Sequence, residues 1–416
     1  MIPSFPYLRR PAVAACLLAL GVALAGCAGP SVPAPPPEPQ AAPGAPAGIE
    51  TPNASPSAPV EGAPLAELAQ QPGKTGIALL LPLSGPNAGI GRALLDAAEM
   101  AVFDAADERF ELMPRDTGGT PDGAAKAAQA ALAAGARLIL GPLLQQEVEA
   151  VRPIARSANV NLVAFSTSTG LAGDGTWLLS FLPKQQVDRV VAFAHEKGAS
   201  RFAALAPATP YGDLVVQELR AAATADGAGV VRVETYDPTA VDVSPAVRSL
   251  ASAVRQTGEA DFDALMLPDG GEKLKAVAPM LPFYDIDTAK VRLLGTGLWD
   301  DPGLGREPAL VGGWFAAPPP DARADFEKHF QALYKRRPPR LATLGYDATA
   351  LAAVLARGGD FSAAAIANPS GFAGVDGIFR FRPDGLVQRG LAVLEVTRDG
   401  TNVVSPAPET FEQTAF

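Results

Sequence analysis

Short apolar runs alternate with amphipathic stretches from residue 76 onward. The runs at 77–81, 137–140 and 161–165 are almost entirely apolar, as strands buried on both faces of a sheet are. The stretches between them carry apolar residues at helical spacing, for example over 93–103. Strands separated by helices in this way predict parallel sheets with helices on both faces.

The same alternation restarts near residue 185. Four further strands are expected at the apolar runs 202–205, 230–233, 264–267 and 291–294. Thr120-Pro121 and Thr209-Pro210 are each typical of a helix N-cap followed by proline at the first helical position. The roughly 340 residues from 76 to the end exceed what a single core usually holds. We therefore expect an α/β protein with two doubly wound parallel-sheet lobes.

The first 27 residues have the features of a targeting signal. Arg9 and Arg10 precede an apolar stretch at 12–26, which is too short to span a bilayer. It ends in Leu-Ala-Gly-Cys, which resembles the lipobox of bacterial lipoproteins. The resemblance implies a lipoprotein signal peptide over 1–26 and a lipid attached to Cys27, with Ala28 favouring the outer membrane. The alternative is a secreted protein that is cut nearby.

Residues 27–75 contain the expected lipidated cysteine and a linker rich in proline and alanine. By count, 13 of the 41 prolines lie between Pro30 and Pro72. Such a segment has too few large apolar residues to offset the entropy of ordering it, so we expect it to be extended or disordered. It would act as a tether between a membrane of the cell envelope and a globular head.

Composition excludes several classes of function. The chain has 416 residues, a formal net charge of −10, two cysteines and two histidines. An acidic balance disfavours a nucleic-acid partner, which needs a basic face. Two cysteines cannot form a disulfide framework, and two separate histidines cannot form a zinc cluster. We expect neither a metal site nor a cofactor.

No catalytic motif is complete. The glycine-containing stretch 85–91 lacks the lysine of a phosphate-binding loop, and His195-Glu196 has no second histidine at zinc-protease spacing. Asp300 and Asp301 form a carboxylate pair, which leaves an enzyme acting in a cleft as one alternative. A solvated loop or a helix cap explains the same pair. We therefore expect a protein without catalytic residues.

Small polar residues follow several of the expected strands. In doubly wound sheets, ligands bind outside the carboxyl ends of the strands, where these loops converge. Hydroxyl groups beside helix N-termini suit a carboxylate or another small polar ligand. The candidate ligand-binding residues are Ser84, Gln145, Ser168 and Thr169 in the first lobe and Tyr211, Asp269 and Asp300 in the second.

Several motifs together resemble the leucine-binding-protein-like receptors. They are the stretches 76–86, 138–143, 165–169 and 209–212, the aromatic series Phe326, Phe330 and Tyr334, and Gly345-Tyr346-Asp347-Ala348. The resemblance covers about residues 76–396 and implies the type I periplasmic binding protein fold, in which two lobes joined by three crossings close on a ligand. It implies a first lobe built from 76–183 and 317–376 and a second built from 184–316 and 377–410.

The resemblance also implies roles for part of the site. Ser168 and Thr169 stand where these receptors hold the carboxylate of an amino acid, and Gln145 replaces a hydroxyl residue of a neighbouring loop. The acid that should neutralise the ammonium of the ligand falls near Gly297. A buried ammonium without a counter-charge costs several kcal/mol. Asp269 and Asp300 are the acids that could substitute, and neither is at the matching position.

A related branch, the lipoprotein activators of penicillin-binding proteins, shares this fold and fits further features. The lipobox, the long linker and the altered amino-acid site agree with it, and the stretches 374–385 and 389–393 resemble it. This resemblance implies a non-enzymatic envelope lipoprotein that activates a peptidoglycan synthase. The alternative is a solute-binding receptor of an ABC importer, with an ABC permease as its partner and an amino acid or similar polar molecule held by Ser168, Thr169 and Tyr211.

Overall fold

The computed structural model describes residues 73–301 and 303–411. The expected signal peptide, Cys27 and almost the whole linker lie outside the described residues. Within the described ranges, each helix is too short or too polar to span a bilayer.

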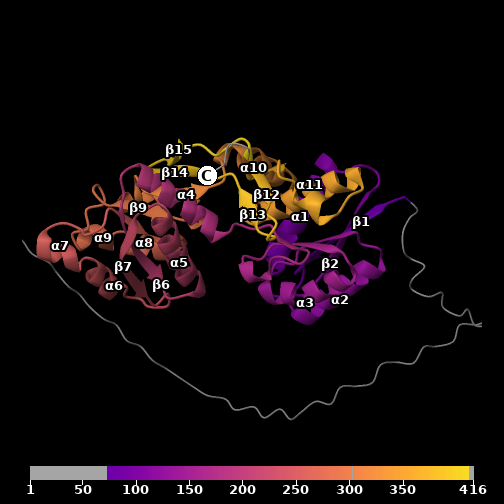
Figure 1. Cartoon of the computed structure of the whole chain (residues 1–416), viewed down its shortest axis with the longest axis horizontal. Helices are drawn as coiled ribbons and strands as arrows, with labels where there is room; N and C mark the ends of the chain where they lie inside the picture. The colour runs from indigo at the N-terminus through magenta and orange to yellow at the C-terminus, as the bar shows by residue number, and fades with distance from the viewer. Residues whose placement is uncertain (1–72, 302, 412–416) are drawn as a thin grey trace, which may run out of the picture. The chain divides into compact units, whose positions relative to one another are not determined.

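A five-stranded parallel sheet forms the first lobe (Figure 1). Its strand order is β2-β1-β3-β4-β5, with neighbours parallel throughout. The strands are β1 (Thr75–Leu81), β2 (Phe110–Asp116), β3 (Leu138–Leu140), β4 (Asn161–Ala164) and β5 (Thr176–Leu178). The expected strands at 77–81, 137–140 and 161–165 are confirmed to within two residues.

Helices cover both faces of this sheet because β1 is apolar on both sides. Ile77, Leu79 and Leu81 pack with α1 (Ala88–Ala105) and α11 (Ala342–Gly358). Ala78 and Leu80 pack with α2 (Pro121–Ala133) and α3 (Gln145–Ser157). Figure 1 shows the orange α11 beside the indigo α1, although the two helices are far apart in sequence. The helix α10 (Pro320–Tyr334) joins α1 through a smaller core cluster.

The second lobe contains a seven-stranded sheet in the order β15-β14-β10-β9-β8-β6-β7. Five strands are parallel, as expected for a doubly wound lobe: β6 (Arg201–Pro207), β7 (Gly229–Tyr236), β8 (Ala264–Met266), β9 (Arg292–Gly295) and β10 (Trp314–Ala317). The strand β14 (Ala392–Thr397) adds to β10 in the antiparallel direction, and β15 (Gly400–Ser405) pairs antiparallel with β14.

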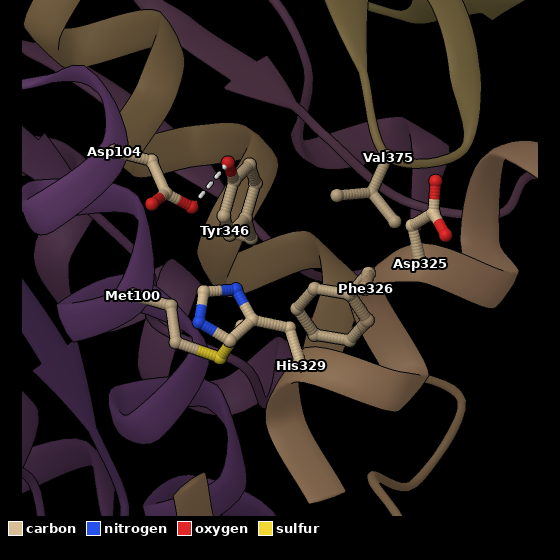
Figure 2. A pocket seen from close by; sticks show the side chains of 7 residues that line it. All are labelled: Met100, Asp104, Asp325, Phe326, His329, Tyr346 and Val375. Carbon is tan, nitrogen blue, oxygen red and sulfur yellow. Dashed lines mark hydrogen bonds between the residues drawn. The ribbon is translucent and has the colours of Figure 1, made fainter. Parts of the chain in front are cut away.

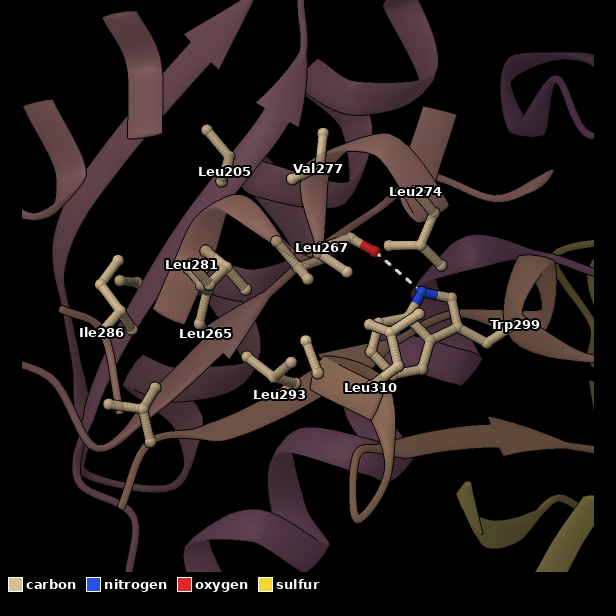
Figure 3. Close-up of a cluster of buried hydrophobic side chains, with 14 of the residues drawn as sticks. Leu205, Leu265, Leu267, Leu274, Val277, Leu281, Ile286, Leu293, Trp299 and Leu310 are labelled. Carbon is tan, nitrogen blue, oxygen red and sulfur yellow. Dashed lines mark hydrogen bonds between the residues drawn. The ribbon is translucent and has the colours of Figure 1, made fainter. Parts of the chain in front are cut away.

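Two hydrophobic cores enclose the second sheet. On one face, α4 (Pro183–Glu196) and α5 (Pro210–Ala225) pack on the sheet. The other face is covered by the short helices α6 (Ser244–Leu250), α7 (Ser252–Thr257), α8 (Gly271–Val277) and α9 (Met280–Phe283). Figure 3 shows leucine side chains of this second core around Trp299, whose indole N–H donates to the carbonyl of Leu267 at 3.2 Å.

A third, antiparallel sheet changes the expected lobe boundary. It consists of β11 (Phe372–Gly374), β12 (Gly377–Phe381) and β13 (Val387–Arg389). Residues 377–410 were expected to belong to the second lobe. The side chains of Phe379, Phe381 and Val387 instead join the core of the first lobe, because alternate residues of these strands face α11. The second lobe resumes only at β14.

Candidate functional site

The first-lobe loop after β1 is organised by Asp116. One oxygen of its carboxylate accepts the backbone N–H groups of Leu83 at 2.9 Å, Ser84 at 3.2 Å and Gly118 at 2.8 Å. Desolvation disfavours the charged form, but hydrogen bonds from Ser84, Gly118 and Leu83 outweigh it and lower the pKa of Asp116. Ser84 is thereby fixed on a loop separate from those of the other first-lobe candidates.

Gln145 and Ser168 lie in contact. The Ser168 hydroxyl donates to Oε1 of Gln145 at 2.7 Å, and the Gln145 amide donates to Glu149 at 2.9 Å. Gln145 opens α3 after β3, whereas Ser168 follows the neighbouring strand β4, so parallel pairing brings both to one edge of the sheet. Thr169 begins the short 3₁₀ helix Thr169–Leu171 and is exposed. These hydroxyl and amide groups can donate hydrogen bonds to a carboxylate.

In the second lobe, Tyr211 and Asp269 each have a partner within the protein. The Tyr211 hydroxyl lies 2.8 Å from Oγ1 of Thr296. The Tyr236 hydroxyl donates to Oδ2 of Asp269, and the N–H of Gly270 donates to Oδ1 at 2.8 Å. Burial and the bond to Asp269 raise the pKa of Tyr236 far above its usual value, so this hydroxyl keeps its proton.

Gly297 is held by a glutamine that sequence reasoning did not single out. The N–H of Gly297 donates to Oε1 of Gln186 at 2.7 Å, across 111 positions of sequence. A Cβ atom at position 297 would lie 3.2 Å from that oxygen. An acidic side chain therefore fits there only if Gln186 moves. The position expected to hold the counter-charge of an ammonium is occupied by a neutral amide contact.

Asp300 is already paired with arginine. Both terminal nitrogens of Arg323 donate to its carboxylate, and Nη2 lies 3.2 Å from Oδ1. Nε of Arg340 lies 3.4 Å from Oδ2. The side chains of Asp300 and Arg323 are only 12% and 15% exposed. The charge of Asp300 is compensated by residues of the protein itself.

Residues 74–401 match the sequence pattern of the family described as periplasmic binding protein. The match covers well over half of the chain. This chain belongs to the periplasmic binding protein family.

Three known proteins illustrate what this periplasmic binding protein is similar to. An uncharacterized protein of Rickettsia prowazekii is 23% identical over 224 residues, which are 53% of this chain and 59% of that protein. A leucine-binding protein of Thermotoga maritima is 22% identical, with 80% of this chain and 98% of that chain covered and a TM-score of 0.58. A solute-binding protein of an ABC transporter from Rhodopseudomonas palustris, in complex with benzoate, is 21% identical, with coverages of 81% and 98% and a TM-score of 0.57.

These solved structures confirm the type I periplasmic binding fold that the motifs predicted. The Thermotoga maritima protein is described as a leucine-binding protein, and at this identity both structures show the fold alone. The described part of this periplasmic binding protein contains no group of three or more histidine, cysteine, aspartate or glutamate side chains that could hold a metal ion.

A buried ionic network lies beside one passage of the chain between the lobes. Nη1 of Arg389 donates to Asp347 at 3.3 Å, and the side chains of this pair are 2% and 0% exposed. Nη2 of Arg340 lies 2.8 Å from Oδ1 of Asp376, another fully buried carboxylate. The guanidinium groups of Arg340 and Arg389 lie 4.1 Å and 4.9 Å from the ring centre of Phe181.

This network has a structural role in the periplasmic binding fold. Phe181 precedes α4 and Arg389 ends β13, so their contact ties together two segments that lead from one lobe to the other. Burial opposes ionisation of Asp347 more than the charge of Arg389 favours it, and its pKa is raised. No local sequence pattern indicates these pairs, because each joins residues at least 36 positions apart.

Proposed function

We propose that this chain is a non-enzymatic periplasmic lipoprotein that activates a peptidoglycan synthase by docking onto it. The observation that carries the proposal is that Gly297 stands at the position expected for the counter-charge of a ligand ammonium, while Asp300 is neutralised by arginines and Asp269 already accepts two hydrogen bonds. Gly297 packs on Gln186, Asp269 accepts from Tyr236 and Gly270, and Asp300 is paired with two arginines.

Recruiting Asp300 to a free amino acid would disrupt its own ion pairs. Arg323 is 15% exposed, so loss of its partner would leave a largely buried cation with incomplete compensation. Breaking a buried pair typically costs about 3–5 kcal/mol, which is comparable to the free energy available from binding a small amino acid at millimolar to micromolar affinity. A receptor for free amino acids is therefore a poor match to this arrangement.

The envelope location and the partner class rest on sequence resemblance. The lipobox at Cys27 and the linker would hold the head beside the cell wall. The stretch 374–385 resembles the activator branch. It runs from the end of β11 through β12 into the turn before β13, and it includes the buried Asp376. The chain would act by binding the active conformation of the synthase more tightly than the inactive one and so shifting its population.

A solute-binding receptor of an ABC importer is the second candidate, and the contact between Gln145 and Ser168 favours it. The exposed Thr169 hydroxyl and the second amide proton of Gln145 can donate hydrogen bonds to a carboxylate. The hydroxyls of Ser84, Ser168 and Tyr211 can do so by exchanging their present partners. The benzoate complex of the Rhodopseudomonas palustris relative is a precedent for a carboxylate that carries no ammonium. In this case the ligand would be a small carboxylic acid, and an ABC permease would be the partner.

Thermal unfolding of the purified chain with benzoate, leucine and isoleucine separates the two functions. A ligand at about 1,000 times its dissociation constant adds about 4 kcal/mol to the free energy of unfolding, which raises Tm by several degrees. Such a shift, lost in Ser168→Ala and kept in the control Ser157→Ala on the same lobe, would support the receptor. The hydroxyl of the exposed Ser157 donates to the carbonyl of Pro153 within α3.

The activator function is tested with a bifunctional penicillin-binding protein purified from the same organism. We expect the full chain to increase the rate at which this enzyme polymerises glycan strands, in the presence or absence of benzoate and amino acids. An unchanged rate over a wide range of chain concentration would refute the proposed activation, whatever the result of the thermal unfolding.

A further inference from the structure

A cavity of about 230 Å³ lies among three helices of the first lobe, and none of the candidate ligand-binding residues lines it. Figure 2 shows the side chains that enclose it. Its lining includes Met100 and Asp104 of α1, Asp325, Phe326 and His329 of α10, and Tyr346 of α11.

The inner wall of the cavity is apolar and aromatic. Met100 and Phe326 are 2% and 6% exposed and belong to the core cluster beneath it. The rings of Phe326 and Tyr346 meet edge to face, with centres 5.7 Å apart and an interplanar angle of 78°. These two rings supply aromatic surface to the wall of the cavity.

The position of Asp104 is fixed by Tyr346. The tyrosine hydroxyl donates to Oδ2 of Asp104 at 2.9 Å, the bond drawn in Figure 2. Burial and this bond raise the pKa of Tyr346 to about 12, so the hydroxyl keeps its proton and the carboxylate stays the acceptor. Within the described residues, the other oxygen of Asp104 takes no side-chain hydrogen bond, so it can accept another donor.

The charge around the cavity is negative. Asp104 and Asp325 are exposed, and neither takes part in an ion pair within the described residues. Of the seven lining residues, His329 has a basic side chain, and none is lysine or arginine. Carboxylates beside aromatic rings attract cations, since the ring faces add a cation–π contribution within about 6 Å.

We propose that this cavity binds a cationic group carried on a short apolar stem, such as an alkylammonium or the side chain of a lysine. The stem would contact Met100 and Phe326, and the ammonium would bond to Asp325. Asp104, on the opposite side of the lining in Figure 2, would add to the attraction. The volume lies below the roughly 300–1,000 Å³ of pockets that enclose drug-sized ligands, which favours a side chain or a small amine. Binding in this cavity would be independent of any ligand held by the candidate ligand-binding residues.

Isothermal titration of the full chain with butylammonium tests the proposal, with butanol and butyrate as neutral and anionic controls of similar size. We expect saturable binding of butylammonium alone. Asp325→Asn should weaken it roughly tenfold, because one charge-assisted bond is lost. Asp325 is exposed, so this variant should fold. Asp399→Asn removes the same charge from an exposed turn of the second lobe and should leave the affinity unchanged.

A second arm identifies the source of the cation. A short lysine-containing peptide is compared with the same peptide acetylated on the lysine. Binding of the unmodified peptide that is lost on acetylation and weakened by Asp325→Asn assigns the cavity to a partner chain, whereas binding of butylammonium alone assigns it to free amines. Equal binding of butanol and butylammonium, or affinities unchanged in both Asp104→Asn and Asp325→Asn, would overturn the proposal.

Discussion

The contact between α1 and α11 allows a sharp test of the first-lobe packing, because α11 contains two glycines in opposite surroundings. A Cβ atom at Gly345 would lie 2.2 Å from the carbonyl oxygen of Leu94 and 3.0 Å from its carbonyl carbon. Both are backbone atoms of α1 and cannot rotate away. A Cβ atom at Gly358, the last residue of the same helix, would meet nothing within 4 Å.

These surroundings predict opposite effects of alanine. In an open helical position, alanine stabilises by about 0.5–1 kcal/mol relative to glycine, so Gly358→Ala should raise the free energy of unfolding by that amount. Gly345→Ala gains the same preference but must push the two helix backbones apart. Overpacking of this kind costs about 1–3 kcal/mol or more. We expect a net loss of about 1–2 kcal/mol and therefore a difference between the two variants of about 1.5–3 kcal/mol.

Urea unfolding followed by circular dichroism measures both variants under identical conditions. The midpoint should fall for Gly345→Ala and rise for Gly358→Ala, with the slope of the transition unchanged. A Gly345→Ala variant as stable as the wild type would refute the close approach of α1 and α11. A destabilised Gly358→Ala variant would instead contradict the open space around the Cβ position of Gly358.

Two further predictions concern charged groups. Burial opposes ionisation of Asp263, but hydrogen bonds from Arg201 and Ser200 outweigh it and lower its pKa to about 2. The ionised Asp263 therefore stabilises the fold above its ordinary pKa, and this contribution is lost as the pH falls toward 2. Between about pH 5 and about pH 3, the free energy of unfolding of the wild type, measured in urea, should fall by about 1 kcal/mol more than that of Asp263→Asn. Equal losses would contradict the lowered pKa. Arg389→Met leaves the buried Asp347 without its counter-charge and should cost about 3–5 kcal/mol near neutral pH. The loss should shrink in acid, where Asp347 takes up a proton, and an equal loss at about pH 5 and about pH 8 would argue against it.

The candidate site was predictable in part. Gln145 and Ser168 each follow an apolar strand, and parallel pairing of β3 and β4 brings their loops together, as expected. The same rule placed Asp300 among possible ligand contacts. It could not indicate that Arg323 and Arg340 pair with this acid, because both arginines lie in a later segment that belongs to the other lobe.

The lobe boundary shows a similar limit. The alternation of apolar residues along β12 is consistent with packing on either lobe, so the sequence offered no reason to prefer one. The contact of Phe379 and Phe381 with the core around α11 assigns β12 to the first lobe. The expected boundary at Gly377 was therefore misplaced by the length of two strands and their turn.

The sequence by itself determined the periodic elements, because a strand buried on both faces must be apolar along its length and a helix N-cap needs a particular side chain at one position. The run at 77–81 and the pair Thr209-Pro210 carry this information locally. Only the tertiary structure decided which charges are compensated and where a cavity remains. Those features depend on pairs such as Asp300 with Arg323, or Asp104 with Tyr346, whose members come together only when distant elements pack. No local sequence pattern indicates these contacts.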